Sequence, residues 1–358
     1  MGKLKVGIIG AGGIAQFAHI PCFQKIPDVE VIAISDINEE KLKFVSEKFK
    51  IPKTFKNWES LLEEDIDIIS ICSPNVFHAK QSIASLESGK HVLCEKPICI
   101  SSKEAEEIFK TVEKTGKKFM GAFPRRFSGE AKVLKTLIEK GDFGQIYYVK
   151  TNYLRRRGIP GLGTWFTNKN LSGGGAMMDI GVHMLDFVIY LIGAPMPEII
   201  VGTTFNKFKE KAIDGGWPPL ETRIGDKKTN IFDVEELSSG YIKFSNGVAL
   251  FVEASWAGNS EEGSRTSIFG TKAGAQLPDP EDPLKPIKIY SEINGILTNI
   301  TPFVPKSDVY QEEFNHFIEC IRKDKEPITK KEEIISVVKI IEGIYKSAET
   351  QKPVILKN

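Results

Sequence analysis

An apolar stretch near the middle of the chain carries three titratable side chains at helical spacing. Residues 173–190 read GGGAMMDIGVHMLDFVIY. This stretch contains Asp179, His183 and Asp186, which are separated by four and three positions. In a helix, side chains at these spacings project from one face. Two acids and an imidazole on one face could hold a metal ion, or could exchange protons with a substrate.

The first third of the chain alternates short apolar runs with stretches of helical periodicity. Helix-like stretches over residues 14–25, 39–49, 77–88 and 103–115 each follow a short apolar run. Continuous apolar strands separated by helices indicate a parallel sheet that is covered on both faces. We therefore expect an α/β domain over residues 1–123, a doubly wound parallel sheet of the Rossmann type.

The turn after the first apolar run matches a dinucleotide-binding pattern. It reads GAGGIA and contains Gly10, Gly12, Gly13 and Ile14 before Ala15. In such turns the first glycine permits the tight bend and the second lets the backbone approach a pyrophosphate, at a helix N-terminus. Because the turn follows a strand and opens a helix, it predicts a dinucleotide site.

The second apolar run ends in an acid that bears on the choice of dinucleotide. Asp36 closes this run, and Ile37 and Asn38 follow it. A carboxylate here would accept hydrogen bonds from the adenosine ribose and repel a 2′-phosphate, and no arginine follows directly. We predict NAD as the cofactor in preference to NADP. The alternative is a solvated loop acid.

Polar side chains follow two further strands of the same sheet. One strand runs into Ser73, Pro74 and Asn75, and the next ends in Glu95 and Lys96. Ligands of open α/β sheets bind beyond the carboxyl ends of the strands, so these residues are candidates for lining the dinucleotide. From its position alone, the lysine could equally be a surface charge.

Beyond residue 123 the chain changes to alternating, strand-like segments. Asn246-Gly247 is a hairpin turn signal inside the longest of these segments. The pattern indicates an α+β domain over residues 124–358, with helices on one side of a mostly antiparallel, open sheet. Residues 212–230 are loop-like in composition and form either a lid over a site or a mobile surface loop.

A glycine-rich connection leads into the apolar helix and supplies candidate substrate contacts. It contains Arg157 and Trp165, and a tryptophan offers an apolar face that suits a sugar ring. Arg125 and Arg126 follow the first domain and are further candidates near the cleft between the domains. The alternative is a packed tryptophan with solvated arginines.

These motifs together resemble the Gfo/Idh/MocA oxidoreductase family. The resemblance rests on the nucleotide fingerprint, on CEKP at a strand end and on MDIGVHMLD, in this order. It implies NAD(P)-dependent oxidation of a carbinol, or reduction of a ketone, on a sugar, cyclitol or related polyol. It also implies that Lys96 lies between nicotinamide and substrate, that His183 exchanges the hydroxyl proton and that Asp179 assists it. Either Lys96 or His183 could accept the proton. The family further implies a homodimer or homotetramer formed through the open sheet.

Three other functions share parts of this pattern. Asp179, His183 and Asp186 could be metal ligands. However, the sequence contains no further cluster of His or Cys residues of the kind that would favour zinc. We expect instead that Asp186 orients His183. An NAD-dependent glycosidase that uses transient oxidation would need the same dinucleotide site. So would a non-catalytic, sugar-responsive regulator, although pure binding does not require Lys96 together with Asp179 and His183.

Composition argues against nucleic acid and membranes as partners. The chain has 358 residues, and its 48 basic and 47 acidic side chains leave a net charge of +1. Such a balance does not favour a phosphate backbone or an anionic bilayer. The five cysteines show no disulfide framework, which is expected in the cytoplasm. No segment approaches the roughly 18 to 20 continuous apolar residues of a membrane span.

Overall fold

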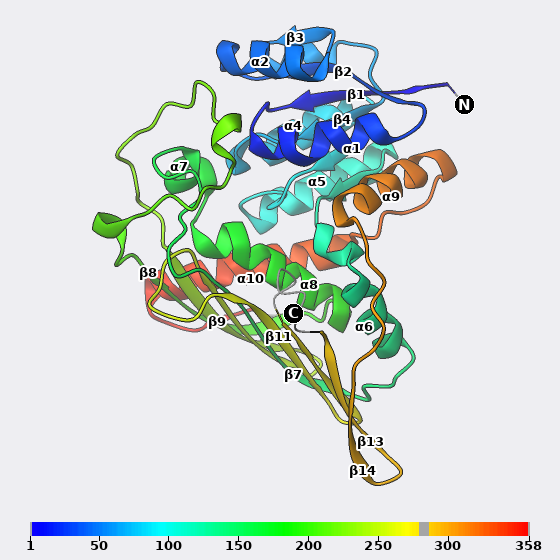
Figure 1. Cartoon of the computed structure of the whole chain (residues 1–358), viewed down its shortest axis with the longest axis vertical. Helices are drawn as coiled ribbons and strands as arrows, with labels where there is room; N and C mark the ends of the chain where they lie inside the picture. The colour runs from blue at the N-terminus through cyan, green and yellow to red at the C-terminus, as the bar shows by residue number, and fades with distance from the viewer. Residues whose placement is uncertain (1, 279–285, 357–358) are drawn as a thin grey trace.

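The computed structural model describes residues 2–278 and 286–356, and it contains two sheets with helices packed around them. The smaller sheet lies at the end of the molecule that carries the N-terminus, and the larger one lies at the opposite end (Figure 1). Helices α8 and α10 lie between the two sheets in this view. The two-part α/β and α+β organisation predicted from the sequence is confirmed.

The smaller sheet has six parallel strands in the order β3-β2-β1-β4-β5-β6. Its strands are Leu4–Ile9 (β1), Val29–Ser35 (β2), Lys53–Phe55 (β3), Ile68–Ile71 (β4), His91–Cys94 (β5) and Phe119–Gly121 (β6). The helices between them are Ala15–His19 (η1, a π-helix), Ile20–Lys25 (α1), Glu39–Phe49 (α2), Trp58–Leu62 (α3), Asn75–Phe77 (η2), His78–Glu87 (α4) and Ser102–Thr115 (α5). The strand order reverses between β1 and β4, where open α/β sheets bind their ligands.

The larger sheet has nine strands in the order β14-β13-β12-β11-β7-β10-β9-β8-β15. Only β7 and β10 pair in parallel within the described residues, and the other neighbours are antiparallel. The strands are Ile146–Leu154 (β7), Pro197–Phe205 (β8), Leu237–Phe244 (β9), Ala249–Ser255 (β10), Gly263–Gly270 (β11), Ala273–Leu277 (β12), Lys288–Ile293 (β13), Ile296–Ile300 (β14) and Val354–Ile355 (β15). Gly247 has φ +89° and turns β9 into β10, as the hairpin signal predicts.

Helices cover one face of this sheet and fill the space between the domains. They are Pro124–Phe127 (η3), Gly129–Glu139 (α6), Trp165–Thr167 (η4), Lys169–Ser172 (α7), Met177–Gly181 (η5, a π-helix), Val182–Ile192 (α8), Val309–Lys323 (α9) and Lys331–Thr350 (α10). The run Lys169–Ile192 is long and apolar enough, by length and composition, to cross a membrane. However, 89% of its most apolar window is buried inside the protein, so its composition is that of a core helix.

The chain returns to the first domain near its C-terminal end. Phe314 and Phe317 of α9 are fully buried in the core cluster that also contains residues of β1, β2 and α1. The ring of Phe314 meets the ring of His19 edge to face at 4.9 Å. The expected division at residue 123 therefore describes the sheets, while α9 contributes its apolar face to the first core.

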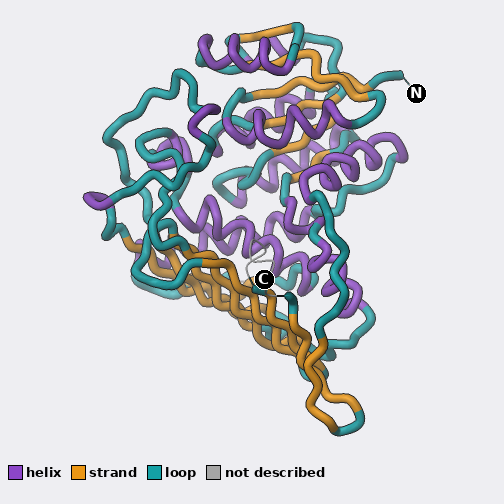
Figure 2. Tube along the Cα trace, viewed as in Figure 1, coloured by secondary structure: helices purple, strands orange, loops and turns teal. Residues whose placement is uncertain are grey.

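The long connection between β8 and β9 also crosses from one domain to the other. Residues 206–236 leave the nine-stranded sheet and reach η1 and α2 as a loop with two short helical turns, Lys209–Lys211 (η6) and Leu220–Thr222 (η7) (Figure 2). Thr222 is buried, and its carbonyl oxygen accepts a hydrogen bond from Nε2 of Gln16 at 3.3 Å. For residues 212–230 of this connection the sequence predicts an insertion or lid, or else a mobile surface loop, and in the structure Pro218 of this part packs on Gly13 of the dinucleotide turn.

Candidate active site

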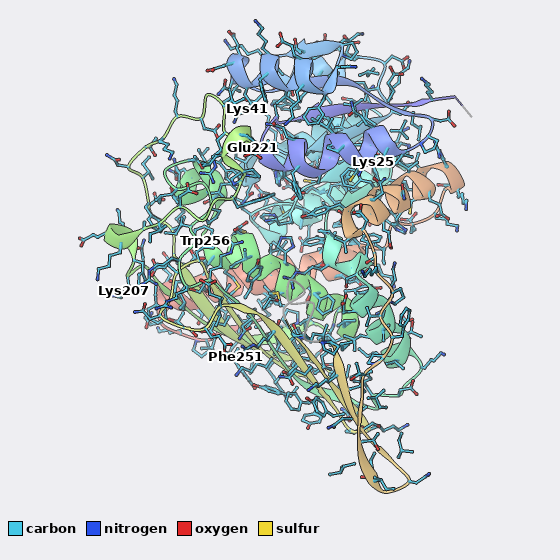
Figure 3. The ribbon with its side chains drawn as sticks, in the orientation of Figure 1. Lys25, Lys41, Lys207, Glu221, Phe251 and Trp256 are labelled. Atoms are coloured by element: carbon cyan, nitrogen blue, oxygen red, sulfur yellow. The ribbon has the colours of Figure 1, made fainter. Side chains whose placement is uncertain are left out.

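A pocket of about 400 Å³ lies where residues of the two domains meet, within the size range of small-molecule sites. The first domain contributes Ile14, Ser73, Asn75, Glu95 and Lys96, and the second contributes Tyr153, Arg155, Trp165, Asp179, His183, Trp217 and Trp256. Figure 3 labels Trp256 between the large sheet and the first domain. The pocket therefore brings strand-end residues of the first sheet together with two of the three titratable residues of the apolar helix.

A lysine from the first domain binds an aspartate from the second in this pocket. Lys96 follows β5, and its ammonium donates to Oδ1 of Asp179 at 2.9 Å and to the carbonyl oxygen of the same residue at 3.0 Å. The other carboxylate oxygen, Oδ2, accepts from Nε1 of Trp256 at 3.0 Å. Asp179 thus holds the ammonium of Lys96 in the pocket.

Glu95 shapes the turn that carries the lysine. Its Oε1 lies 2.9 Å from Nε2 of His19, and its Oε2 accepts from the backbone N–H of Lys96 at 3.0 Å. Nδ1 of His19 lies 2.6 Å from Oγ of Ser70 in the neighbouring strand. Burial alone would raise the pKa of Glu95, but the hydrogen bond and charge of His19, together with the charges of Lys96 and His78, lower it overall. The carboxylate therefore stays ionised.

His183 lines the same pocket as Lys96 and is surrounded by positive charge. Burial lowers the pKa of its imidazole well below the ordinary value of 6.5, and the charges of Lys96, Arg125 and Arg155 lower it further. The ring is therefore neutral near pH 7 and able to accept a proton. This is the protonation state that a base for a hydroxyl group requires.

Asp186 points into the core and not into the pocket, which corrects one expectation. Arg126 donates to it from Nε at 2.9 Å and from a terminal nitrogen at 2.6 Å, and the same guanidinium binds Glu333. Both Arg126 and Asp186 are 1% exposed. His183 and Asp186 both lie in α8, where a separation of three positions turns the two side chains about 60° apart around the helix axis. The π-helical residues 177–181 change only the angle between Asp179 and these two residues. Neither residue is available to substrate, and Asp186 does not orient His183.

The other candidate substrate residues are divided between the pocket and its surroundings. Trp165 lines the pocket and stacks on Phe166, with ring centroids 3.9 Å apart. Arg125 is not among the residues that line the pocket; it donates to Oγ of Ser264 at 3.1 Å, and its guanidinium lies over the ring of Tyr153. Its charge nevertheless reaches His183.

Arg157 is directed away from the pocket. It donates to Oδ1 of Asn259 at 2.8 Å, and its guanidinium lies 4.3 Å from the ring centroid of Phe208. Of the three consecutive arginines, Arg155 is the one that lines the pocket. The structure therefore replaces Arg157 with Arg155 as the arginine that can meet a substrate.

The turn after β1 fits a dinucleotide. Gly10 has φ +97°, and a Cβ there would lie 2.6 Å from the carbonyl oxygen of Cys72. A Cβ on Gly12 would meet only that same oxygen, at 4.0 Å, so the backbone next to it is open to a pyrophosphate. Gly13 instead makes room for the protein, because its Cβ would lie 2.2 Å from Cβ of Pro218.

Asp36 is held in place at the end of β2. Its Oδ2 accepts from the backbone N–H of Ala11 at 2.8 Å, and its Oδ1 accepts from that of Asn38 at 2.9 Å. Each carboxylate oxygen retains accepting capacity for a ribose hydroxyl. The carboxylate is therefore fixed beside the dinucleotide turn, where the sequence placed it.

Of the three candidate residues that follow β4, Ser73, Pro74 and Asn75, only two line the pocket. Ser73 and Asn75 line the pocket, and Asn75 donates to the carbonyl oxygen of Ser172 in the second domain at 2.8 Å. Ser73 donates from Oγ to Oε1 of Gln81 at 2.6 Å. Pro74 precedes the short helix η2 and does not line the pocket.

Three residues with important positions were not found from the sequence. Trp256 and Trp217 line the pocket. Buried Glu235 accepts from the backbone N–H groups of Gly175 and Met177 at 2.9 and 3.1 Å, and so fixes the start of the helix that carries Asp179. The position of Trp256 just after a strand was an available signal, whereas Glu235 and Trp217 lie in irregular segments without a motif.

A metal ion has no evident ligand set in residues 2–278 and 286–356. Among them, no group of three or more His, Cys, Asp or Glu side chains is placed to hold one. Asp179, His183 and Asp186, the set considered from the sequence, do not converge, because Asp186 binds Arg126.

Comparisons with known proteins agree with this arrangement. A D-glucoside 3-dehydrogenase from Escherichia coli (strain K12) is 32% identical over 97% of this chain and 96% of its own. A glucose-6-phosphate 3-dehydrogenase from Bacillus subtilis (strain 168) is 34% identical over 52% of this chain and 53% of its own. The fold matches that of a levoglucosan dehydrogenase solved with NADH and levoglucosan, with a TM-score of 0.83, 21% identity and coverage of 99% and 100% of the two chains.

Family models cover both domains. The model of an oxidoreductase family with an NAD-binding Rossmann fold matches residues 4–123, and the model of that family's C-terminal α/β domain matches residues 135–356. With the dinucleotide turn on one side of the pocket and Lys96, Asp179 and His183 around it, the chain belongs to the Gfo/Idh/MocA family of NAD-binding oxidoreductases.

Proposed function

We propose that this oxidoreductase transfers a hydride between NAD(H) and a ring carbinol of a pyranose sugar. One observation carries the proposal: a single pocket is lined by Ile14 of the dinucleotide turn, by Lys96 and by His183. The residues that bind the dinucleotide thus adjoin a hydrogen-bond donor and a neutral base. Oxidation of an alcohol requires both, because the hydroxyl proton must leave as the hydride does.

The side chains divide the work as follows. A bound NAD would supply the hydride acceptor for oxidation, and NADH the hydride donor for reduction. His183 takes the proton of the sugar hydroxyl at its neutral imidazole. Lys96 donates a hydrogen bond to the same oxygen and stabilises the negative charge that develops there. Asp179 and Trp256 keep the lysine in this position through the contacts described above.

The aromatic lining suits a sugar ring. Tyr153, Trp165 and Trp217 line the pocket, and aromatic faces pack well against the C–H groups of a pyranose. Arg155 adds a donor for ring hydroxyls or for an acidic substituent. Since the two named relatives above are 3-dehydrogenases of a glucoside and of a glucose phosphate, we propose a D-glucoside as substrate and carbon 3 as the site of oxidation.

We also propose NAD in preference to NADP, because Asp36 is fixed at the end of β2, from which a carboxylate would repel a 2′-phosphate. The cytoplasm is the proposed compartment, in keeping with five buried, unpaired cysteines.

Assembly through the large sheet is a further part of the proposal. On the face opposite the helices, Val201, Tyr241 and Phe251 lie side by side on three adjacent strands. Val201 and Tyr241 are 43% and 41% exposed, and Figure 3 labels Phe251 on this face. An exposed apolar sheet face is typical of a subunit interface, so we propose a homodimer or homotetramer. Light scattering on the purified protein tests this, and a monomer at working concentration would refute it.

An absorbance screen tests the activity. The purified protein is incubated with NAD or NADP and with D-glucosides, free aldoses, anhydrosugars or inositols, and NAD(P)H formation is followed at 340 nm. We expect NADH with a D-glucoside, and NMR of the product should show a ketone at carbon 3. Cleavage of the glycoside without net NADH would instead support the NAD-dependent hydrolase. The absence of both reactions across the panel would reject the proposal.

A further inference from the structure

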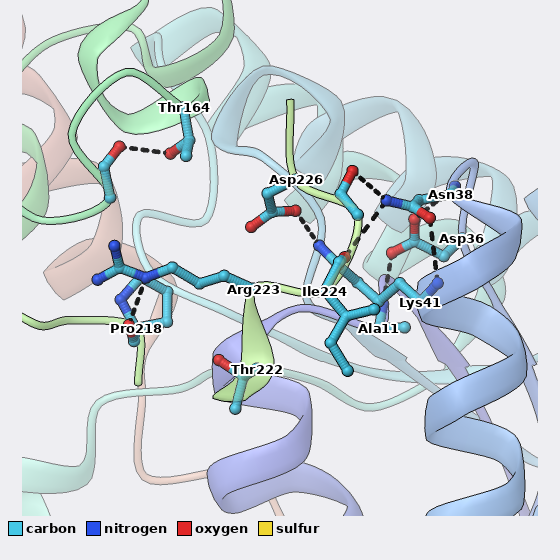
Figure 4. Close-up of polar contacts among 12 residues, drawn as sticks. Ala11, Asp36, Asn38, Lys41, Thr164, Pro218, Thr222, Arg223, Ile224 and Asp226 are labelled. Carbon is cyan, nitrogen blue, oxygen red and sulfur yellow. Dashed lines mark hydrogen bonds and ion pairs between the residues drawn. The ribbon is translucent and has the colours of Figure 1, made fainter. Parts of the chain in front are cut away.

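The side chain of Lys41 lies at the adenosine end of the proposed dinucleotide site, and a residue of the second domain binds its ammonium. Lys41 is the only basic residue between Ser35 and Leu42. It lies in the first turn of α2, its side chain is 9% exposed, and its ammonium binds the carboxylate of Asp226. Figure 4 shows this ion pair next to Asn38 and Asp36. The cation is therefore already neutralised by a carboxylate from residues 206–236.

The segment that supplies Asp226 contacts the first domain at several points between Gly13 and Lys41, and we name residues 217–226 the strap. Nδ2 of Asn38 donates to the carbonyl oxygen of Gly225 at 2.7 Å and to that of Ile224 at 3.4 Å. At the other end, the ring of Trp217 meets that of Phe17 edge to face at 5.6 Å. The strap thus reaches from the sugar pocket, which Trp217 lines, to the end of β2.

The strap is braced by Arg223, both within itself and to Asp214 just before it, and it fits closely against the first domain. Arg223 donates to Oδ1 of Asp214 at 2.9 Å and to the carbonyl oxygen of Pro218 at 2.6 Å. Gly225 has φ +64°, and a Cβ there would lie 2.4 Å from Nδ2 of Asn38. Gly13 accommodates Pro218 in the same way. A larger residue at Gly13 or at Gly225 would therefore displace Pro218 or Asn38.

These contacts bear on the 2′-phosphate, the group that distinguishes NADP from NAD. Enzymes that use NADP hold the 2′-phosphate with a basic side chain that follows the second strand. Here that side chain is Lys41, and Asp226 occupies its ammonium while Asp36 stands nearby as a second carboxylate. The amide of Asn38, another donor at this position, is used by the strap carbonyls.

We propose that the strap forms one wall of the adenosine-ribose site, and that Asp226 excludes a 2′-phosphorylated dinucleotide by binding Lys41. The inference rests on the proposed NAD site and extends its specificity to a residue of the other domain, 190 positions after Asp36. Asp36 repels the phosphate directly, whereas Asp226 withholds the cation that would attract it.

Cofactor binding without sugar tests this. Dissociation constants for NAD and NADP are measured by titration for the wild type, Asp226→Asn and the double variant Asp226→Asn/Lys41→Gln. Asp226→Asn should bind NADP about tenfold more tightly, because one charge-assisted hydrogen bond becomes available to the phosphate. Its NAD affinity should stay close to that of the wild type. In the double variant the gain for NADP should disappear. Glu210→Gln, which removes an exposed carboxylate of the same connection outside the strap, should change neither constant.

Several results would overturn the proposal. NADP affinity that is unchanged in both Asp226→Asn and Asp226→Ala is one, and a gain that persists without Lys41 is another. Equal weakening of NAD and NADP in both Asp226 variants would mean that the strap only clamps the dinucleotide. These dissociation constants are measured without sugar, so they can be interpreted even if the protein does not oxidise sugars. Likewise, a negative result for Asp226 would not contradict the proposed sugar oxidation.

Discussion

The ammonium of Lys96 lies 2.9 Å from Oδ1 of Asp179, and this contact joins the two domains inside the pocket. The lysine comes from the end of a parallel strand in the dinucleotide-binding domain, and the aspartate comes from the π-helical start of the core helix. The position of the lysine relative to a substrate therefore depends on the docking of one domain on the other.

Loss of the charge on Asp179 should impair turnover and leave cofactor binding intact. Asp179→Asn removes the anionic partner of Lys96, and we expect kcat to fall on the order of 100-fold, as displaced catalytic groups commonly cause. Trp256→Phe removes only the donor to Oδ2 and should lose less. Steady-state kinetics with a D-glucoside and NADH fluorescence titrations measure the two effects. Equal losses in both variants, or weakened NADH binding, would contradict the positioning role.

The pH dependence of oxidation should reflect the depressed pKa of His183. In the oxidative direction the imidazole must be neutral, so activity should persist below pH 6.5 and fall only as pH drops through the lowered pKa. Arg155→Gln removes one of the charges that lower this pKa, so the acidic limb of kcat/KM should move to higher pH. Arg156→Gln, at the exposed neighbouring position, is the matched control and should leave the limb unmoved. A limb at the same pH in both variants would argue against His183 as the base.

The buried ion pair of Arg126 and Asp186 should matter for stability. Asp186→Ala leaves a buried guanidinium with only Glu333 as its carboxylate partner, and we expect a loss of about 3–5 kcal/mol in the free energy of unfolding. Urea denaturation measures it, and Asp142→Ala, at an exposed position, should change stability by less than about 0.5 kcal/mol. If Asp186→Ala were as stable as the wild type and had a raised KM for sugar, Asp186 would be a substrate-binding residue and not a structural one.

Much of the first domain could be predicted because its signals are local. Each strand is a short apolar run, and the turn at Gly10 and the acid at Asp36 stand at fixed places relative to β1 and β2. The hairpin at Gly247 is local as well. The joining of Lys96 to the helix with Asp179 came from the family resemblance, since no spacing in the sequence relates residues 83 positions apart.

What could not be predicted depends on helix geometry and long-range packing. The expectation that Asp179 and Asp186 share a face assumes one continuous α-helix, but residues 177–181 are π-helical and Asp186 binds Arg126. The position of the strap was even less predictable from the sequence. Asn38 and Gly225, which hydrogen-bond to each other, are 187 positions apart, and no motif marks Gly225. Such contacts arise only when the complete chain has folded.

The most direct test of hydride transfer at this pocket is the rate of NADH formation by Lys96→Met, measured at 340 nm with a D-glucoside under single-turnover conditions. NAD binding is measured on the same preparation. Since the lysine is assigned to stabilise the reacting oxygen, we predict a rate reduced on the order of 1,000-fold, with NAD affinity retained. A variant that binds NAD and forms NADH at a rate close to that of the wild type would contradict this account of the site.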